Sequence, residues 1–328
     1  MVNRLCKQGM TLLATACLLF AGVCFGRSSS PPVLQQTTPT HDIRVKTELV
    51  ALAVSATDRH GNFVSGLPES DFRVYEDSHL QHIALFAPGD VPVTVGILVD
   101  HSGSMAPRLD QVVAAAAAFV KSSNPQDEIF VENFNENVRP GLPPGIEFSS
   151  DINLLASAIL GQPAEGETAL YDAISAGLRT LRDGHGRRQA LLIVTDGGDN
   201  ASSISLRDIT TLAGRSNAPM YFIGISDPND EDSRPRILKR LAKITGGRAY
   251  FPQFADQVGP LCRQIARDIR EQYTIGYVPS ASNSSGAFHK IRVAVSAPGH
   301  GKLQVHTRAG YFSDAGSIPQ PTLASEKP

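Results

Sequence analysis

One short segment of the chain carries side chains suited to metal chemistry: Asp100-His101-Ser102-Gly103-Ser104. The carboxylate and the two hydroxyls stand at alternate positions, so on one loop they can converge on a common point. Carboxylate and hydroxyl oxygens are ligands of hard divalent cations. Ser and Asp are also preferred at helix N-caps, and a cap followed by a solvated turn is the alternative interpretation. The segment alone leaves both interpretations open.

Two further oxygen-bearing residues stand where the same site would need them. Asp196 directly follows the apolar run 190–195, just as Asp100 directly follows the apolar run 93–99. Thr168 precedes a segment with helical periodicity. In a doubly wound sheet, ligands bind in the crevice at the carboxyl ends of the strands. These residues therefore favour a cation site over a simple cap.

The elements that would position these residues alternate between strand and helix. The expected strands are 93–99, 129–134, 190–195 and 220–225, and the expected helices are 109–121, 170–181, 206–213, 237–244 and 254–272. Strands that are apolar on both faces, each followed by an amphipathic helix, indicate a parallel sheet covered on both sides. We therefore predict an α/β fold with a doubly wound, mostly parallel sheet and helices on both faces.

Short strand-like runs flank this region on both sides. They lie at 43–57, 72–75 and 83–86 before it, and at 273–278, 289–296 and 303–307 after it. Neither set is large enough for a core of its own, so we predict that the two sets pair into one small β-sandwich. The expected boundaries are a β unit at 42–89, an α/β domain at 90–272, a C-terminal β segment at 273–312 and a disordered tail at 313–328.

The first residues have the pattern of a signal peptide, expected to span 1–26. Arg4 and Lys7 supply the positive start, and 11–25 is an uncharged apolar stretch too short to span a bilayer. A flexible leader is expected at 27–41 because its composition is polar and Pro-rich. We expect an exported protein, periplasmic or secreted, with no transmembrane segment in the mature chain. Lipid attachment at Cys24 is the less favoured alternative.

Charge balance and cysteine count exclude two further classes, namely basic nucleic-acid-binding proteins and proteins held together by internal disulfides. The chain has 30 Lys plus Arg against 32 Asp plus Glu, so no overall positive field would attract nucleic acid. Of its 4 cysteines, only Cys262 lies beyond the signal segment. An intramolecular disulfide is thereby excluded, and we expect this thiol to be buried on a helix.

The oxygen-bearing residues, taken as a set, resemble the metal-ion-dependent adhesion site of the von Willebrand factor A family. That site combines Asp-x-Ser-x-Ser with a separate Thr and a separate Asp. The matching positions here are Asp100, Ser102, Ser104, Thr168 and Asp196. The resemblance covers about residues 91–272.

The flanking segments are similar to those of secreted bacterial proteins with a VWFA-related domain. The motifs concerned are Gly66-Leu67-x-x-x-Asp71-Phe72-x-Val74-Tyr75-Glu76-Asp77, Tyr273-x-Ile275-Gly276-Tyr277-x-Pro279 and Arg308-x-Gly310-Tyr311. This resemblance implies that the two β segments belong to one unit, and it implies nothing about the ligand.

The family resemblance implies a function in binding another protein. The expected cation is Mg²⁺, with Mn²⁺ or Ca²⁺ as alternatives. Because the hydroxyl ligands are neutral, only Asp100 and Asp196 bring charge to the ion, which stays a strong electrophile. An Asp or Glu carboxylate of a partner protein would then occupy an open coordination position. The sequence defines neither that partner nor an oligomeric state.

Two other functions remain as alternatives. The cation could be purely structural, tying three loops together. A hydrolase is less favoured, because Ser102 and His101 are adjacent and point apart on an extended loop, and the Gly-x-Ser-x-Gly elbow is missing. A zinc site at His79 and His82 is not expected, since the pair has no third ligand nearby in the sequence. We predict that the protein is not an enzyme.

Neighbouring residues are expected to have lesser roles. We expect His101 at the rim of the site, and Asp199 with Asn200 in a helix cap or turn. The acidic run 227–232 is expected to be a solvated loop at the same edge of the sheet. We hypothesise that this loop biases partner choice toward basic or mixed surfaces.

Overall fold

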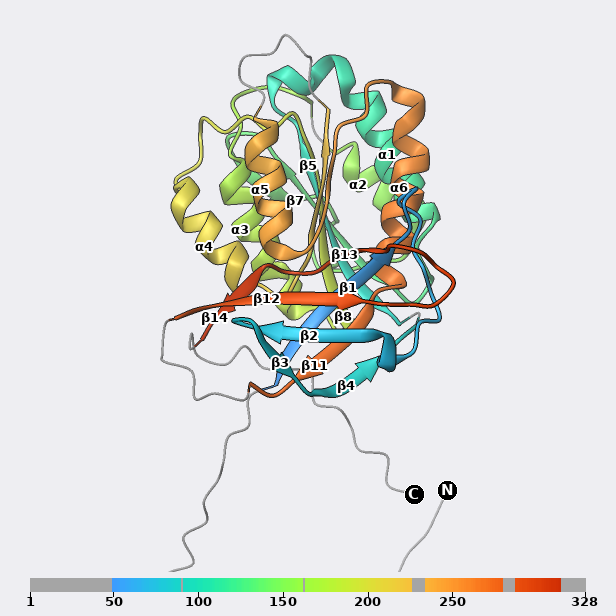
Figure 1. The fold of residues 1–328 in the computed structure, drawn as a ribbon. Helices are drawn as coiled ribbons and strands as arrows, with labels where there is room; N and C mark the ends of the chain where they lie inside the picture. The colour runs from blue at the N-terminus through green and yellow to red at the C-terminus, as the bar shows by residue number, and fades with distance from the viewer. Residues whose placement is uncertain (1–48, 90, 162, 226–233, 280–286, 314–328) are drawn as a thin grey trace, which may run out of the picture. The chain divides into compact units, whose positions relative to one another are not determined.

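The computed structural model describes residues 49–89, 91–161, 163–225, 234–279 and 287–313 (Figure 1). These residues belong to one compact unit, Thr47–Pro328. The predicted signal peptide, the leader, the first residues of the β unit, the acidic run 227–232 and the tail from 314 onward lie outside them. Within these ranges, no helix is long and apolar enough to cross a membrane.

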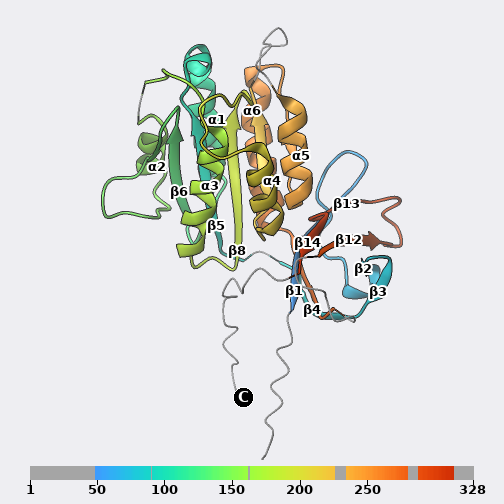
Figure 2. The same ribbon diagram turned by 90° about the vertical axis from the view of Figure 1, so that its left-hand side faces the viewer.

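A six-stranded sheet forms the centre of the α/β part, in the order β10-β9-β8-β5-β6-β7. Its strands are β5 (Val93–Asp100), β6 (Glu128–Phe134), β7 (Val138–Pro140), β8 (Arg188–Thr195), β9 (Met220–Gly224) and β10 (Ala249–Tyr250). All neighbours are parallel except β6 and β7. Figure 2 shows β8, β5 and β6 side by side. Every residue of β5 is buried, as expected for a strand covered on both faces.

Two layers of helices cover this sheet (Figure 1). One core cluster joins the sheet to α1 (Leu109–Lys121), α2 (Ile152–Ile159) and α6 (Ala255–Arg270). The other joins it to α3 (Leu170–Thr180), α4 (Leu206–Arg215) and α5 (Pro235–Thr245). The predicted doubly wound fold is therefore confirmed. Cys262 is buried on α6, as predicted, and burial raises the pKa of its thiol to about 12.

The flanking strands form two four-stranded antiparallel sheets, in the orders β13-β1-β11-β4 and β14-β12-β2-β3. The N-terminal strands are β1 (Val50–Thr57), β2 (Phe72–Glu76), β3 (His79–Gln81) and β4 (Ile83–Ala87), and the C-terminal strands are β11 (Tyr273–Tyr277), β12 (Phe288–Val295), β13 (Gln304–His306) and β14 (Gly310–Phe312). Each sheet mixes strands from both ends of the chain, and one apolar cluster joins the two sheets. The predicted β-sandwich is confirmed.

Candidate metal-ion site

The carboxyl ends of β5 and β8 bring two of the predicted ligands to one edge of the sheet. These strands are parallel neighbours, with Val99 opposite Val194. Asp100 ends β5, and Asp196 is the first residue after β8. Ser102 follows at the N-cap position of the 3-10 helix Gly103–Arg108, but its side chain makes no capping hydrogen bond. Capping is therefore not the role of this hydroxyl.

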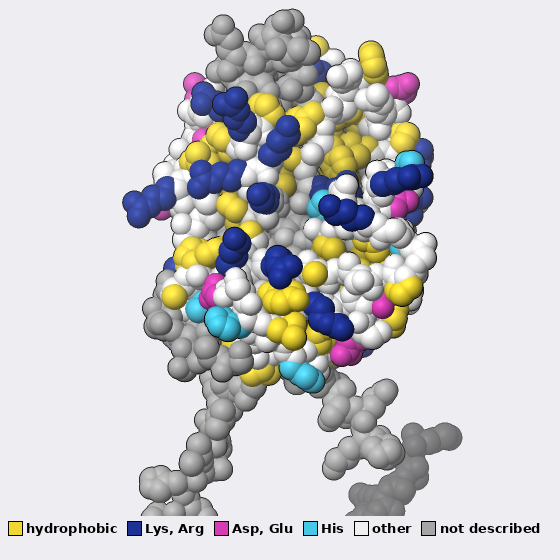
Figure 3. Space-filling view, in the orientation of Figure 1, with side chains coloured by type: hydrophobic (Ala, Val, Ile, Leu, Met, Phe, Trp, Pro, Cys, Tyr) yellow, Lys and Arg dark blue, Asp and Glu magenta, His cyan; other side chains and the backbone are white. Residues whose placement is uncertain are grey.

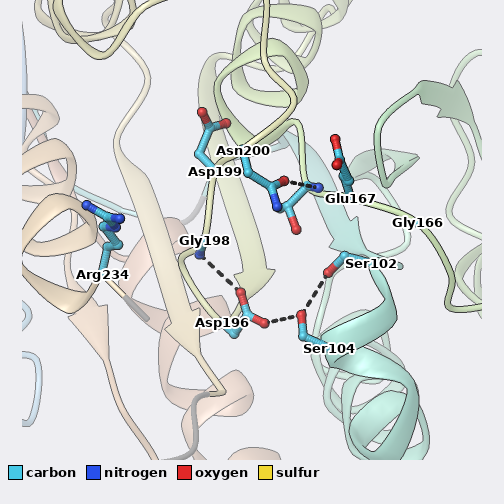
Figure 4. A pocket seen from close by; sticks show the side chains of 10 residues that line it. Ser102, Ser104, Gly166, Glu167, Asp196, Gly198, Asp199, Asn200 and Arg234 are labelled. Carbon is cyan, nitrogen blue, oxygen red and sulfur yellow. Dashed lines mark hydrogen bonds between the residues drawn. The ribbon is translucent and has the colours of Figure 1, made fainter. Parts of the chain in front are cut away.

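Three oxygen-bearing side chains meet in front of this edge (Figure 4). The hydroxyls of Ser102 and Ser104 are 3.1 Å apart and share a hydrogen bond. Ser104 donates its hydroxyl proton to Asp196 Oδ2 at 2.5 Å. The other oxygen of Asp196 accepts a hydrogen bond from the backbone N–H of Gly198 at 3.1 Å. The loops after β5 and β8 are thus joined through side chains that carry oxygen ligands.

Asp100 lies behind the two serines and is fully buried. Its Oδ1 accepts a hydrogen bond from the backbone N–H of Ser102 at 2.9 Å, and its Oδ2 accepts one from the Thr195 hydroxyl at 2.6 Å. Burial raises the pKa of this carboxyl to about 7, and the nearby charge of Asp196 acts in the same direction. A proton or a cation would stabilise the site at neutral pH.

The segment before α3 supplies Thr168 as the third part of the site. The backbone carbonyl of Gly166 accepts a hydrogen bond from Gly103 N–H at 3.0 Å, which ties this segment to the first loop. Thr168 N–H donates to Asn200 Oδ1 at 2.8 Å, and Thr168 O accepts from Asn200 N–H at 3.0 Å. Gly166 has a φ of 81°, a conformation that favours glycine. These contacts hold Thr168 between the other two loops.

A cavity of about 270 Å³ opens at this junction. Its lining residues are Ser102, Ser104, Gly166, Glu167, Thr168, Asp196, Gly198, Asp199, Asn200 and Arg234. Four of the five predicted ligands are among them, and Asp100 is not. The cavity is slightly smaller than the roughly 300–1,000 Å³ typical of small-molecule sites. A hydrated ion and one incoming side chain fit such a space better than a cofactor does.

Comparison with known proteins identifies a domain family for the segment that carries these residues. A family model described as von Willebrand factor type A domain matches residues 95–198, a range that contains all five predicted ligands. The chain contains a von Willebrand factor type A (VWA) domain. A search of curated proteins found no match.

Solved structures from three organisms are similar to the chain. The von Willebrand factor type A protein from Catenulispora acidiphila is 15% identical, with 86% of this chain and 78% of that chain covered and a TM-score of 0.49. The vWF domain of the type V pili tip protein Mfa5 from Porphyromonas gingivalis is 12% identical, with 55% and 97% covered and a TM-score of 0.45. Manganese-loaded Plasmodium vivax TRAP protein is 16% identical, with 74% and 99% covered and a TM-score of 0.44.

The oxygens of the VWA domain have the spacing that a hard cation requires. An octahedral ion with ligands at 2.0–2.1 Å has neighbouring oxygens about 2.9 Å apart. The separations of 3.1 Å between Ser102 and Ser104 and 2.5 Å between Ser104 and Asp196 lie on either side of that value. Small side-chain movements would replace the mutual hydrogen bonds by bonds to an ion. The donor set therefore fits a divalent cation.

The prediction that His101 lies at the rim of the site was wrong. Its side chain is completely buried, and its Nε2 is 3.1 Å from the backbone carbonyl of Ile159 at the end of α2. Alternation along the loop turns His101 away from the serines, as predicted, but the side toward which it turns is covered by α2. His101 contributes to packing beneath the loop rather than to the surface.

Asp199 and Asn200 hold the start of α3, in agreement with the predicted cap or turn. Asp199 Oδ1 accepts hydrogen bonds from Tyr171 N–H at 3.1 Å and from the Ser202 hydroxyl at 2.5 Å. Burial raises the pKa of Asp199. Both residues also line the cavity.

Two charged residues of the cavity lining, Glu167 and Arg234, were not predicted from the sequence. Arg234 directly precedes Pro235, the first residue of α5, and therefore lies at the same edge of the sheet as Asp196. Proline at the first position of a helix is a sequence signal that could have located Arg234.

Proposed function

We propose that the VWA domain binds a partner protein through a divalent cation held by Asp100, Ser102, Ser104, Thr168 and Asp196. The observation that carries this proposal is the convergence of Ser102, Ser104 and Asp196 at the mouth of an open cavity. The ion we propose is Mg²⁺, with Mn²⁺ or Ca²⁺ as alternatives. When bound, it would supply the positive charge that attracts a carboxylate.

Binding is favoured over catalysis by the surroundings of Ser102. Activation of a serine as a nucleophile needs a base within hydrogen-bonding distance. The adjacent His101 directs its Nε2 to a backbone carbonyl of α2, and the Ser102 hydroxyl contacts Ser104 instead. We therefore propose that the Ser102 hydroxyl is a ligand of the ion and performs no covalent chemistry.

Basic side chains beside the cavity, from Arg234 and α5, favour a partner with an acidic group, although the lining itself also holds Glu167, Asp196 and Asp199. Arg234 lines the cavity on the other side of Asp196 from the two serines (Figure 4). The helix that follows has no Asp or Glu, and its exposed basic residues are Arg236, Lys239, Arg240 and Lys243. Figure 3 shows Lys and Arg side chains gathered on this face of the molecule. A partner with a central Asp or Glu carboxylate would be attracted to this face.

The proposed place of action is outside the cytoplasm. The support is the basic start and apolar stretch of residues 1–26, which have the pattern of a signal peptide. A periplasmic or secreted partner is therefore proposed, while nucleic acid is not.

Metal titration by calorimetry tests this proposal. Chelator-stripped protein is expected to bind one Mg²⁺ or Mn²⁺ per chain in a saturable manner. Asp100→Ala and Thr168→Ala are each expected to weaken binding by more than about 100-fold, because loss of a ligand exceeds the 10–100-fold typical of outer-shell changes. Asp183→Ala removes an exposed carboxylate near the opposite end of α3 and serves as the matched control.

The outcomes separate the proposal from its alternatives. If the folded wild-type protein binds no divalent ion, or if the Asp183→Ala control loses binding as strongly as the site variants, the proposed function is wrong. If the ion binds but a carboxylate ligand binds equally well without it, the cation is purely structural.

Arg234→Gln is expected to weaken binding of a small dicarboxylate, glutarate, to the Mg²⁺-loaded protein by about 2- to 5-fold, the range for an exposed ion pair. Affinity for Mg²⁺ itself should stay within about 2-fold, since Arg234 is not among the proposed ligands. Lys243→Gln makes the same change of charge at the other end of α5 and is the control. Equal effects of the two variants would show that Arg234 has no specific role in carboxylate binding.

A further inference from the structure

A second group of metal-ligating side chains lies in the β-sandwich, away from the VWA cavity. Glu76 and Asp77 stand at the turn between β2 and β3, and His289 lies on β12. One ligand atom from each of them lies within 4.8 Å of the other two. The Nδ1 of His289 is 2.8 Å from Asp77 Oδ2 and 3.5 Å from Glu76 Oε1. Residues more than 200 positions apart in the sequence thus meet at one point.

Each carboxylate uses one oxygen for anchoring and directs the other at the shared point. Glu76 Oε2 accepts hydrogen bonds from the hydroxyls of Tyr277 at 2.6 Å and Tyr311 at 3.2 Å. Asp77 Oδ1 accepts one from the backbone N–H of Lys290 at 2.9 Å. The remaining oxygens, Glu76 Oε1 and Asp77 Oδ2, are those that approach His289 Nδ1. Outer hydrogen bonds that fix the ligand orientation in this way are a regular feature of metal sites.

The backbone holds Asp77 in this position. Asp77 and Ser78 have φ values of 46° and 74°, and they form the two-residue turn between paired Glu76 and His79. Such turns favour Gly or Asn, and Asp is among the few other residues that tolerate them. The side chain of Asp77 is 47% exposed, whereas those of Glu76 and His289 are 6% and 12% exposed. Glu76 and His289 are therefore buried on the protein side of the group, while Asp77 leaves the other side open to water.

We propose that Glu76, Asp77 and His289 bind a zinc ion, with water in the fourth position. Zn²⁺ takes imidazole nitrogen and carboxylate oxygen at about 2.0–2.2 Å, which places tetrahedral neighbours about 3.3–3.6 Å apart. The separations of 2.8 and 3.5 Å require only a small outward movement of Asp77. A set with one imidazole suits zinc better than Mg²⁺, which prefers oxygen alone. This site does not depend on the function proposed for the VWA domain.

The site also explains why motifs from the two ends of the chain come together. Glu76 and Asp77 end the leading motif, while Tyr277 and Tyr311 belong to the closing motifs. Both tyrosines donate to the same oxygen of Glu76. The guanidinium of Arg308 lies 5.4 Å from the centre of the Tyr311 ring and stacks on it. The motifs thus supply a proposed ligand, Glu76, two tyrosines that fix its orientation, and an arginine that packs on one of those tyrosines.

Zinc titration of the untagged full chain, with Mg²⁺ present to fill the VWA site, tests the proposal. The wild-type protein is expected to bind one Zn²⁺, and Co²⁺ in its place is expected to give the visible absorption of a tetrahedral site. His289→Gln and Asp77→Asn should each weaken binding by more than about 100-fold, and Tyr311→Phe by about 10-fold. Asn tolerates the positive φ at position 77, so the Asp77 variant keeps its turn.

Two controls separate this site from other ligands of the chain. His82→Gln removes an exposed histidine just past β3 and should leave zinc affinity within about 2-fold of wild type. Thr168→Ala, which alters the VWA site, should also leave it unchanged. Zinc binding that survives in both His289→Gln and Asp77→Asn would overturn the proposal, as would no binding to wild type at 100 µM Zn²⁺. The three side chains would then form only a hydrogen-bonded cluster without a metal ion.

Discussion

Affinity of the VWA site for Mg²⁺ is expected to fall about 50-fold as the pH is lowered from 7 to 5, because about half of the Asp100 carboxyl is still ionised at pH 7. The cation requires the ionised form of Asp100, whose pKa is raised by burial to about 7. Below that pKa, each pH unit reduces the ionised fraction and therefore the apparent affinity by about tenfold. Above it, affinity should change little. Calorimetric titrations at pH 5, 6, 7 and 8 would measure this dependence.

A surface site made of exposed carboxylates would behave differently. Its ligands would keep pKa values near 4, so affinity would be nearly constant from pH 5 to 8. A flat profile for this protein would therefore show that Asp100 does not have to ionise when the ion binds. The zinc site proposed in the β-sandwich can be excluded from the signal by working with Asp77→Asn as the background.

Asp100→Asn is expected to stabilise the metal-free protein at pH 8 while abolishing cation binding. The folded-state pKa of about 7 lies above the ordinary aspartate pKa of 3.8, so the folded state holds its proton more tightly than the unfolded state does. Stability from this group is fully present below pH 4 and is lost as the pH rises to about 7. The loss amounts to at most about 4 kcal/mol, from 1.36 kcal/mol per pKa unit.

The substitution avoids most of that loss because Asn is neutral. One acceptor oxygen remains for Ser102 N–H or the Thr195 hydroxyl, and the other hydrogen bond is lost at about 1 kcal/mol. The net gain at pH 8 is expected to be about 1 to 3 kcal/mol in the free energy of unfolding, with none at pH 4. Urea unfolding in EDTA at both pH values measures it. A variant that is no more stable than wild type at pH 8 would show that burial of the ionised Asp100 carboxylate does not destabilise the metal-free protein.

Saturating Mg²⁺ should reverse this order of stability. The ion binds the folded wild-type protein and not the variant, and at 100 times the Kd it adds about 2.7 kcal/mol. The buried Asp100 carboxylate thus lowers the stability of the metal-free protein and raises the stability of the metal-bound protein.

Strand and helix positions near the site were predictable because burial on both sides produces continuous apolar runs. β5 and β8 are such strands, and the residues just after them, Ser102 and Asp196, could be placed at one edge of the sheet before their contacts were known. Because neighbouring parallel strands end at the same edge of a sheet, the loops that follow them must begin close together. The position of Asp100 behind the serines was harder to predict from the sequence, since it depends on hydrogen bonds to Ser102 N–H and Thr195.

Several short helices and strands were not predicted from the sequence. One of them, α2, covers His101, which is why the predicted position of His101 was wrong. The helix α2 has 8 residues, too few for a clear periodic signal. Its start was nevertheless marked by Asp151, whose side chain accepts hydrogen bonds from Asn153 and Leu154 N–H. Without α2, nothing in the sequence indicated what covers His101. The three-residue strands β3 and β14 were missed for the same reason.

Contacts between residues far apart in the chain could not be predicted from the sequence. His79 and His82 were considered for zinc because they are close in sequence, whereas the structure places His289 beside Asp77. Their meeting depends on the antiparallel pairing of β2 with β12, in which Glu76 lies opposite Ile291. Arg234 likewise reaches the cavity only through the placement of α5 beside β9.

The most direct test of the central claim is water-proton relaxation on the Mn²⁺-loaded protein. An ion with an open coordination position keeps an exchangeable water and enhances relaxation. Addition of glutarate is expected to displace that water and lower the enhancement in wild type, and to do so less in Arg234→Gln. If Mn²⁺ is bound but glutarate leaves the enhancement unchanged, the ion does not accept carboxylates, and the proposed binding function is wrong.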